Sequence, residues 1–173
     1  MIAKSYEIEK NISLFLKHNF FLIYGENFGL KNDIKDKLIN EIKKNSNTEI
    51  LSFYENEIIE NEDNFYNTVF SGSLFSSEKI IIINSSTDKL LKQIENIEEK
   101  KPENVNFIFL SNILDKKSKL RSFFEENEKT VCIPCYLDNQ RDLETIASIE
   151  LKKENISLSR EALNLLVEKS NAD

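Results

Sequence analysis

The sequence has little of what proteins use for metal or redox chemistry, because it contains one histidine, His18, and two cysteines. The cysteines form the pair Cys132-Ile133-Pro134-Cys135, a spacing that occurs in half of a zinc site or in a thiol–disulfide motif. Zinc requires about four ligands, and the chain has no second cysteine pair. The two cysteines also lie in the β-like run 130–136, where their odd separation points them to opposite faces of a strand. We therefore expect Cys132 and Cys135 to be small buried core residues, and His18 to be structural or solvated.

An excess of positive charge is missing as well. Lysine and arginine number 23 against 30 acidic residues, and the net charge is -7. This balance opposes tight autonomous binding to duplex nucleic acid, so any contact with DNA must be local or shared with other chains. The longest apolar runs, 20–24 and 80–83, are too short to cross a bilayer, and Lys4, Glu7 and Glu9 interrupt any signal-peptide core. We expect a cytoplasmic protein without a membrane partner.

What the sequence does contain is a regular alternation of short apolar runs and helical patterns, which predicts an α/β fold with a parallel sheet. After an amphipathic helix around 6–17, each strand is expected to be buried on both faces, with helices on both sides of the sheet. The five expected strands are 20–24, 49–54, 79–84, 106–111 and 130–134. The expected helical stripes are Leu30, Ile34, Leu38 and Ile42; Leu90, Leu91, Ile94 and Ile97; and Leu120, Phe123 and Phe124.

The alternation stops near Asp138, where a second unit is expected to begin. Leu143, Ile146 and Ile149 indicate one helix, and a further helix carrying Leu163, Leu166 and Val167 is expected to start after the N-cap Ser159. Two such helices are too little to bury a core of their own. We expect them to pack on the sheet domain or to begin a helical bundle.

The first strand runs into a loop that resembles a P-loop without completing it. In the pattern G-x-x-x-x-G-K-[ST], Gly25 and Lys31 align, but Leu30 replaces the second glycine and Asn32 replaces the hydroxyl residue. Leu30 adds bulk where backbone amides must wrap a phosphate, and Asn32 lacks the hydroxyl that ligates Mg²⁺. The third strand ends at Asn84 without a carboxylate for Mg²⁺. We predict a nucleotide-binding scaffold with no intrinsic catalysis and no cofactor, a reading also compatible with Gly25 being an ordinary turn residue.

Leu74 and Phe75 are two large apolar residues that lie just after Gly72 and before the strand 79–84. Phe65, Val69 and Phe70 recur at helical spacing, so a helix is expected to end at 71–72, with Gly72 in the left-handed C-cap conformation. One reading buries Leu74 and Phe75 against this helix end. The other makes them an exposed anchor pair for a pocket on a partner.

Several motifs in this order resemble the delta subunits of bacterial DNA polymerase III, the clamp-loader subunits that engage the sliding clamp. They are Phe21-Leu22-Ile23-Tyr24-Gly25-Glu26; Ser73-Leu74-Phe75 ahead of 79–83; Leu114-Asp115-Lys116-Lys117-Ser118-Lys119; and Cys135-Tyr136 with the helix pair that follows. The resemblance implies an AAA+-like domain over 1–137 with a degenerate nucleotide site. It also implies that 138–173 begin a helical lid, and that the C-terminal collar domain lies outside the chain.

By the same resemblance, Ser73, Leu74 and Phe75 bind the sliding clamp (beta subunit) and help to open the ring for loading onto DNA. The family often carries glutamine five residues before the phenylalanine, where this chain has Phe70. The other implied partners are the gamma/tau and delta prime subunits and primed DNA. The basic residues Lys116, Lys117, Lys119 and Arg121 either follow DNA phosphates or form a solvated helix start. The competing functions are an active P-loop ATPase or nucleotide kinase, and a generic protein-interaction domain.

Overall fold

The computed structural model describes residues 1–44, 47–72, 76–136, 144, 147–148, 151–152 and 154–170. By the density of internal contacts the chain forms two units, Met1–Cys135 and Tyr136–Asp173. The first unit holds the sheet and most of the helices. In the second, the described helix is α8 (Arg160–Ser170). Within the described residues no helix is long and apolar enough to cross a bilayer.

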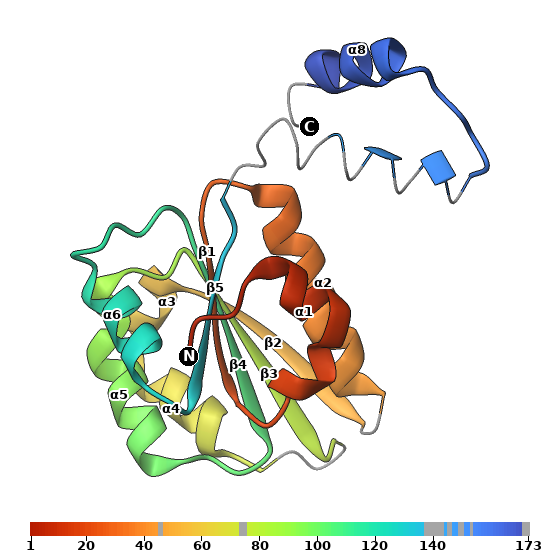
Figure 1. Ribbon diagram of the computed structural model, residues 1–173. Coiled ribbons are helices and arrows are strands. Elements are labelled where there is room, and N and C mark those ends of the chain that lie inside the picture. Colours follow the sequence, from red (N-terminus) through yellow and green to blue (C-terminus); the bar gives the residue numbers. More distant parts are fainter. Residues whose placement is uncertain are drawn as a thin grey trace. The chain divides into compact units, whose positions relative to one another are not determined.

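The first unit is built on a five-stranded sheet in the order β2-β3-β4-β1-β5, and all of its neighbouring strands run parallel, as Figure 1 shows. The strands are β1 (Phe20–Tyr24), β2 (Thr48–Tyr54), β3 (Glu78–Asn84), β4 (Val105–Ser111) and β5 (Thr130–Pro134). The helices are α1 (Ser5–Asn11), α2 (Phe28–Lys43), α3 (Glu55–Glu60), α4 (Glu62–Phe70), α5 (Leu91–Lys100) and α6 (Lys119–Glu126). Short 3-10 helices lie at Ile12–Phe15 and Asp88–Leu90. The predicted α/β fold is therefore confirmed.

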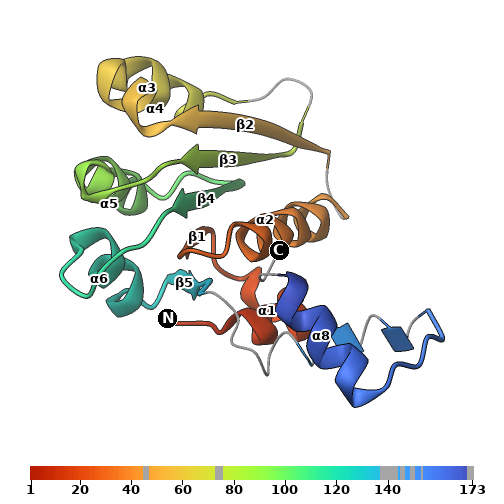
Figure 2. The same ribbon diagram turned by 90° about the horizontal axis from the view of Figure 1, so that it is seen from above.

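Helices cover both faces of this sheet, as predicted, and Figure 2 shows the three layers from above. Alternate residues of each strand point to opposite sides. Phe20, Leu22 and Tyr24 of β1 pack toward α3–α6, and the rings of Phe20 and Phe107 stack at 4.8 Å between centroids. Phe21 and Ile23 pack on the other face against α1 and α2. Two apolar cores thus hold the sheet between its helices.

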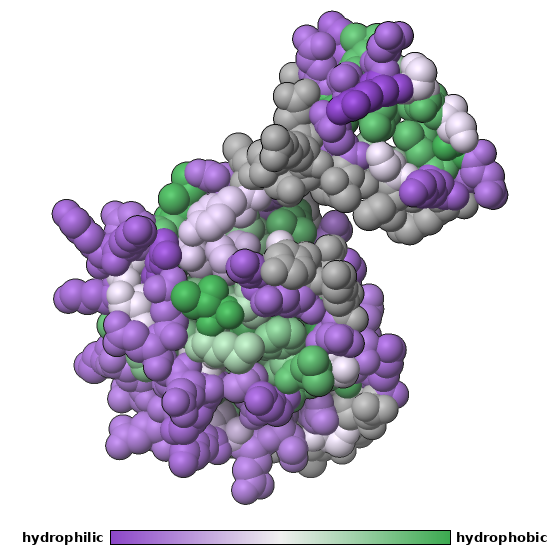
Figure 3. All heavy atoms as spheres, in the orientation of Figure 1, coloured by the Kyte–Doolittle hydropathy of each residue, from purple (hydrophilic) through white to green (hydrophobic). Residues whose placement is uncertain are grey.

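The edge strands differ from the prediction that every strand is buried on both faces. β2 pairs only with β3, and its residues are half-buried or exposed. β5 is buried although it also ends the sheet, because the N-terminal segment runs along it: the amide of Ala3 donates to Cys132 O at 2.9 Å. On the face in Figure 3, hydrophilic residues cover most of the periphery of the first unit, and a hydrophobic area lies near this N-terminal segment, where Met1 and Ile2 are exposed. The sequence pattern alone did not distinguish a covered edge from an open one.

Two helix predictions need correction and one is confirmed. The helix expected over 6–17 is broken at Asn11, where the backbone leaves the helical region (φ -148°, ψ 58°) and a 3-10 turn follows. Helix α4 ends at Phe70, just before the predicted end at 71–72, but its C-cap is Ser71 in an extended conformation, and Gly72 does not adopt a positive φ. In the second unit, Ser159 caps α8 through a hydrogen bond from the amide of Ala162, 3.2 Å. Leu143, Ile146 and Ile149, on which the other expected helix rests, lie outside the described residues, whereas the described residues 144, 147–148 and 151–152 are helical.

Candidate functional site

The loop after β1 is packed tightly against the end of β5. Gly25 has a φ of +133°, and a Cβ on it would lie 2.0 Å from the carbonyl oxygen of Cys135. The amide of Gly25 donates to Asn112 O at 3.2 Å, and that of Asn27 donates to Cys135 O at 3.1 Å. Gly25 is therefore required by the close approach of two backbone segments.

The groups that would bind a phosphate in this loop are engaged within the protein. At the start of α2 the side chain of Asn27 accepts a hydrogen bond from the amide of Leu30, 3.0 Å, so an amide of the first helical turn is already satisfied. The ammonium of Lys31 donates to Ser111 O at 3.0 Å, and the residue is 7% exposed. Burial lowers the pKa of Lys31, against a smaller opposing effect of Cys135. An asparagine amide and a carbonyl oxygen thus hold the groups that a nucleotide phosphate would need.

The polar residues at the carboxyl ends of β3 and β4 are also engaged in hydrogen bonds within the protein. Asn84 donates its side-chain amide to the hydroxyl of Ser52, 2.9 Å, and to Phe53 O, 3.2 Å. Ser111 donates its hydroxyl to Ser86 O at 2.6 Å. Among the residues that the structure describes, no group of three or more His, Cys, Asp or Glu side chains is placed to hold a metal ion. The side chains of Asn84 and Ser111 at this edge of the sheet are therefore already hydrogen-bonded within the protein.

The proposed clamp-binding residues Ser73, Leu74 and Phe75 lie outside the described residues, but both flanks of this segment are defined. On the α4 side, Phe70 is 41% exposed although the sequence pattern grouped it with the buried Phe65 and Val69. Its ring stacks on Tyr66 at 6.3 Å between centroids, and the ammonium of Lys100 lies 5.3 Å from its centre. On the β3 side, the amide of Ser77 donates to Asn47 O at 2.9 Å.

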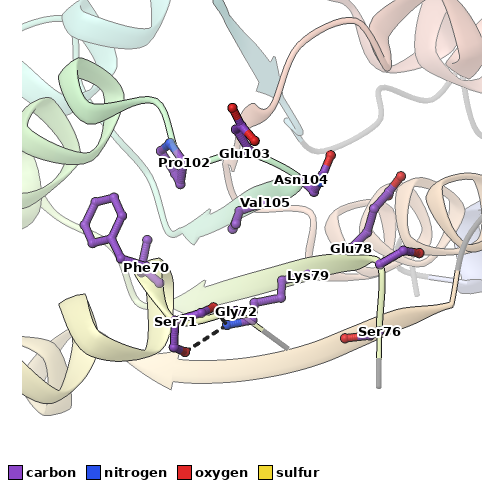
Figure 4. Close-up of a pocket in the computed structure, with 12 residues that line it drawn as sticks. Phe70, Ser71, Gly72, Ser76, Glu78, Lys79, Pro102, Glu103, Asn104 and Val105 are labelled. Atoms are coloured by element: carbon purple, nitrogen blue, oxygen red, sulfur yellow. Dashed lines mark hydrogen bonds between the residues drawn. The ribbon is translucent and has the colours of Figure 1, made fainter. Parts of the chain in front are cut away.

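Lys79 joins these two flanks. It is 6% exposed, and its ammonium donates to Thr68 O at 2.8 Å, to Ser71 O at 2.6 Å and to the hydroxyl of Ser71 at 3.1 Å. Figure 4 shows Lys79 and Ser71 at one side of a hollow of about 350 Å³. One signal in the sequence could have indicated this role, since Lys79 directly precedes four isoleucines of a buried strand.

The predicted basic run divides into two kinds of residue. Lys116, Lys117 and Lys119 are exposed, as either of the two readings requires. Arg121 is half-buried: it donates to Glu125 at 2.7 Å and to Leu114 O at 3.2 Å, and it lies 5.3 Å from the centre of the Tyr24 ring. Arg121 is thus engaged within the domain. Contact between the three lysines and DNA stays a prediction.

Both cysteines are buried, and each belongs to a different core. Cys132 packs with the α3–α6 face and Cys135 with the α1–α2 face, the arrangement predicted from their odd separation. Burial, with a contribution from Glu125 and against the opposing charges of Arg121 and the terminal amine, raises the pKa of Cys132 to about 12. The thiol is therefore protonated at neutral pH and does not serve as a redox nucleophile.

Taken together, the fold is an AAA+-like α/β fold, a parallel five-stranded sheet flanked by helices, with a phosphate loop whose binding groups are occupied internally. Residues 21–136 match the family described as DNA polymerase III, delta subunit, and the chain belongs to this family. It is 26% identical over 149 residues to the probable DNA polymerase III subunit delta of Rickettsia prowazekii (strain Madrid E), covering 84% of this chain and 43% of that protein.

Solved structures agree on the fold. The clamp loader delta protein (YqeN) of Bacillus subtilis superposes with a TM-score of 0.63 at 14% identity, over 94% of this chain and 51% of that one. The replication initiator DnaA bound to AMPPCP and single-stranded DNA superposes with a TM-score of 0.54 at 16% identity, over 93% of this chain and 54% of that one. The chain thus spans about half the length, or less, of these relatives.

Proposed function

We propose that this chain is the sliding-clamp-binding part of a clamp-loader subunit, and that Leu74 and Phe75 enter an apolar pocket on the clamp. The observation that carries the proposal is the family match over 21–136, which includes the whole α4–β3 junction where Ser73, Leu74 and Phe75 lie. Burial of a leucine and a phenylalanine contributes about 3 to 6 kcal/mol before ordering costs. That is enough for a binding hot spot.

The described flanks support a surface role for this junction. Phe70 is 41% exposed at the end of α4, and a Cβ built on Gly72 meets nothing within 4 Å. Phe70 stands where the family often has glutamine, so this chain presents an aromatic side chain in place of an amide at the rim of the contact. We expect the matching clamp surface to be more apolar there.

The proposed role is mechanical and requires no catalysis by this chain. Asn27 and the carbonyl oxygen of Ser111 engage the amide of Leu30 and the ammonium of Lys31, the groups that would hold a phosphate. In this proposal ATP is therefore hydrolysed by other loader subunits, gamma/tau. A protein opens a ring only by binding the open interface more tightly than the closed one. The exposed Lys116, Lys117 and Lys119 are the residues that would meet primed DNA in the assembly, where charges of other chains add to theirs.

The test is a binding measurement between the chain and the sliding clamp encoded with it, using the variant Leu74→Ala/Phe75→Ala. We expect at least a 100-fold loss of affinity, because the two side chains supply the hot spot. The matched control is Leu14→Ala/Phe28→Ala, which removes the same two residue types from positions that are 65% and 71% exposed. The control should bind like the wild-type chain.

Equal affinity of Leu74→Ala/Phe75→Ala and the wild type would refute the assignment of these residues. If the control variant lost binding instead, the chain would be an interaction domain that uses another surface.

A further inference from the structure

We infer that Lys79 is a positioning residue for clamp binding: its buried ammonium ties the end of α4 to the start of β3 and so fixes both ends of the segment that holds Leu74 and Phe75. The inference rests on the proposed function. Its basis is the set of three hydrogen bonds from Lys79 to Thr68 O, Ser71 O and the hydroxyl of Ser71, at 2.8, 2.6 and 3.1 Å.

The chemistry of a helix end explains why a lysine is suited to this place. The last carbonyls of a helix have no partner within it, and they carry the negative end of the helix dipole. Many helices satisfy these carbonyls with a glycine in the left-handed conformation, but α4 ends in the extended Ser71 and Gly72 has no positive φ. Lys79 therefore serves as the cap, reaching back to α4 from the second residue of β3.

Each described flank of the junction is also held by a backbone hydrogen bond. The amide of Ser71 donates to Asn67 O at 2.8 Å, and the amide of Lys79 donates to Asn104 O at 2.9 Å. Among the described residues, Val69, Gly72 and Val105 line part of the hollow in Figure 4, and Lys79 and Ser71 lie at one side of it. Lys79 thus joins the end of α4 to the start of β3 beside this space.

Holding the two flanks of this segment together should lower the conformational entropy cost of binding the clamp. A loop whose ends are held together loses less conformational freedom when its side chains enter a pocket, and preorganisation of this kind raises affinity without any new contact. Removal of the tie should therefore weaken clamp binding even though Lys79 need not touch the clamp.

The experiment compares Lys79→Met, Lys79→Arg and Lys31→Met in clamp binding, at a temperature where circular dichroism shows each variant folded. Lys31 is the matched control, because it is equally buried, at 7% against 6% exposure, and its ammonium also donates to a backbone carbonyl. We expect Lys79→Met to bind about tenfold more weakly, from the restored ordering cost. Lys79→Arg should restore binding to within about twofold of wild type, since arginine keeps charged donors. Lys31→Met should lose stability but keep its affinity for the clamp.

A milder variant covers the case in which Lys79→Met does not fold. Ser71→Ala removes only the hydroxyl partner of Lys79, and we expect it to bind about threefold more weakly. Wild-type affinity of Lys79→Met, or of Ser71→Ala if Lys79→Met is unfolded, would overturn the inference, as would an equal loss in Lys31→Met. Since Leu74→Ala/Phe75→Ala is measured alongside, its loss of binding together with unchanged Lys79→Met would refute the role of Lys79 and leave the proposed function standing. Wild-type binding of Leu74→Ala/Phe75→Ala would refute the proposed function itself.

Discussion

Gly25 shows how a single residue links the degenerate phosphate loop to the stability of the sheet. Its φ of +133° lies in a region that side chains with a Cβ rarely adopt, and the space for a Cβ is occupied by the backbone of Cys135. The sequence predicted a special glycine here from the P-loop pattern. In the structure the glycine is required for a different reason, the close contact of Gly25 with the backbone of Cys135 just after β5.

We therefore predict that Gly25→Ala destabilises the protein by more than about 2 kcal/mol, through backbone strain and a steric clash. Chemical denaturation followed by circular dichroism measures this change. Gly72→Ala is the control, because a Cβ at Gly72 meets nothing within 4 Å and the backbone there has no positive φ. A similar loss in both variants would contradict the explanation from the close contact with Cys135.

At the scale of elements, the start of α6 depends on a carboxylate from another part of the chain. Asp88 accepts hydrogen bonds from the hydroxyl of Ser118 at 2.7 Å and from the amides of Lys119 and Leu120 at 3.1 and 2.9 Å. Burial alone would raise the pKa of Asp88, but these hydrogen bonds and the charge of Lys119 outweigh it and hold the pKa below its ordinary value of 3.8. The carboxylate thus caps a helix that follows it by some thirty residues.

Because the pKa of Asp88 is lower in the folded state, its charged form stabilises the fold above the unfolded pKa, and this contribution is lost as the pH falls through the folded pKa. We predict that Asp88→Asn lowers the free energy of unfolding by about 1 kcal/mol at neutral pH. The difference from wild type should be constant between about pH 5 and 7 and should shrink below about pH 4.

Urea denaturation over this pH range tests the prediction. Asp115→Asn serves as the control for charge, because Asp115 lies in the loop that precedes α6 and accepts an amide hydrogen bond from Lys117, next to the helix start that Asp88 caps. A difference that grows as the pH falls would be inconsistent with the role of the charged Asp88.

At the scale of the whole molecule, the hydrophobic periodicity of the sequence predicted the layers of the fold but not the tertiary contacts that join them. The apolar runs gave the strands, and the stripe of Ile34, Leu38 and Ile42 gave α2, because burial imposes a period on the sequence. The break of the first helix at Asn11 and the cover over β5 depend on tertiary contacts that no local period encodes. The same holds at the site: Gly25 and Lys31 could be found by pattern, whereas the hydrogen bonds from Lys31 to Ser111 O and from Lys79 to the end of α4 join positions that only the fold brings together.

The hydrogen bonds of Asn27 and Lys31 argue against the competing function, an active ATPase. A nucleotide would have to displace Asn27 from the amide of Leu30 and Lys31 from Ser111 O, and it would find leucine and asparagine where a P-loop has glycine and a hydroxyl residue. Each displaced hydrogen bond costs free energy that the phosphate contacts must first recover. We therefore expect no heat of binding when millimolar Mg-ATP is titrated into the chain, and no release of phosphate.

Thermal unfolding gives an independent measure, because a ligand present at 100 times its dissociation constant stabilises a protein by about 2.7 kcal/mol. An unchanged unfolding temperature in millimolar Mg-ATP would thus rule out binding in the micromolar range, provided that an active P-loop ATPase shows the expected shift under the same conditions. The Mg-ATP measurements therefore distinguish an active ATPase from a subunit without nucleotide chemistry. Micromolar binding with turnover would make this chain an ATPase in its own right. Absence of binding would agree with the proposed role, in which the chain acts on the clamp through differential affinity alone.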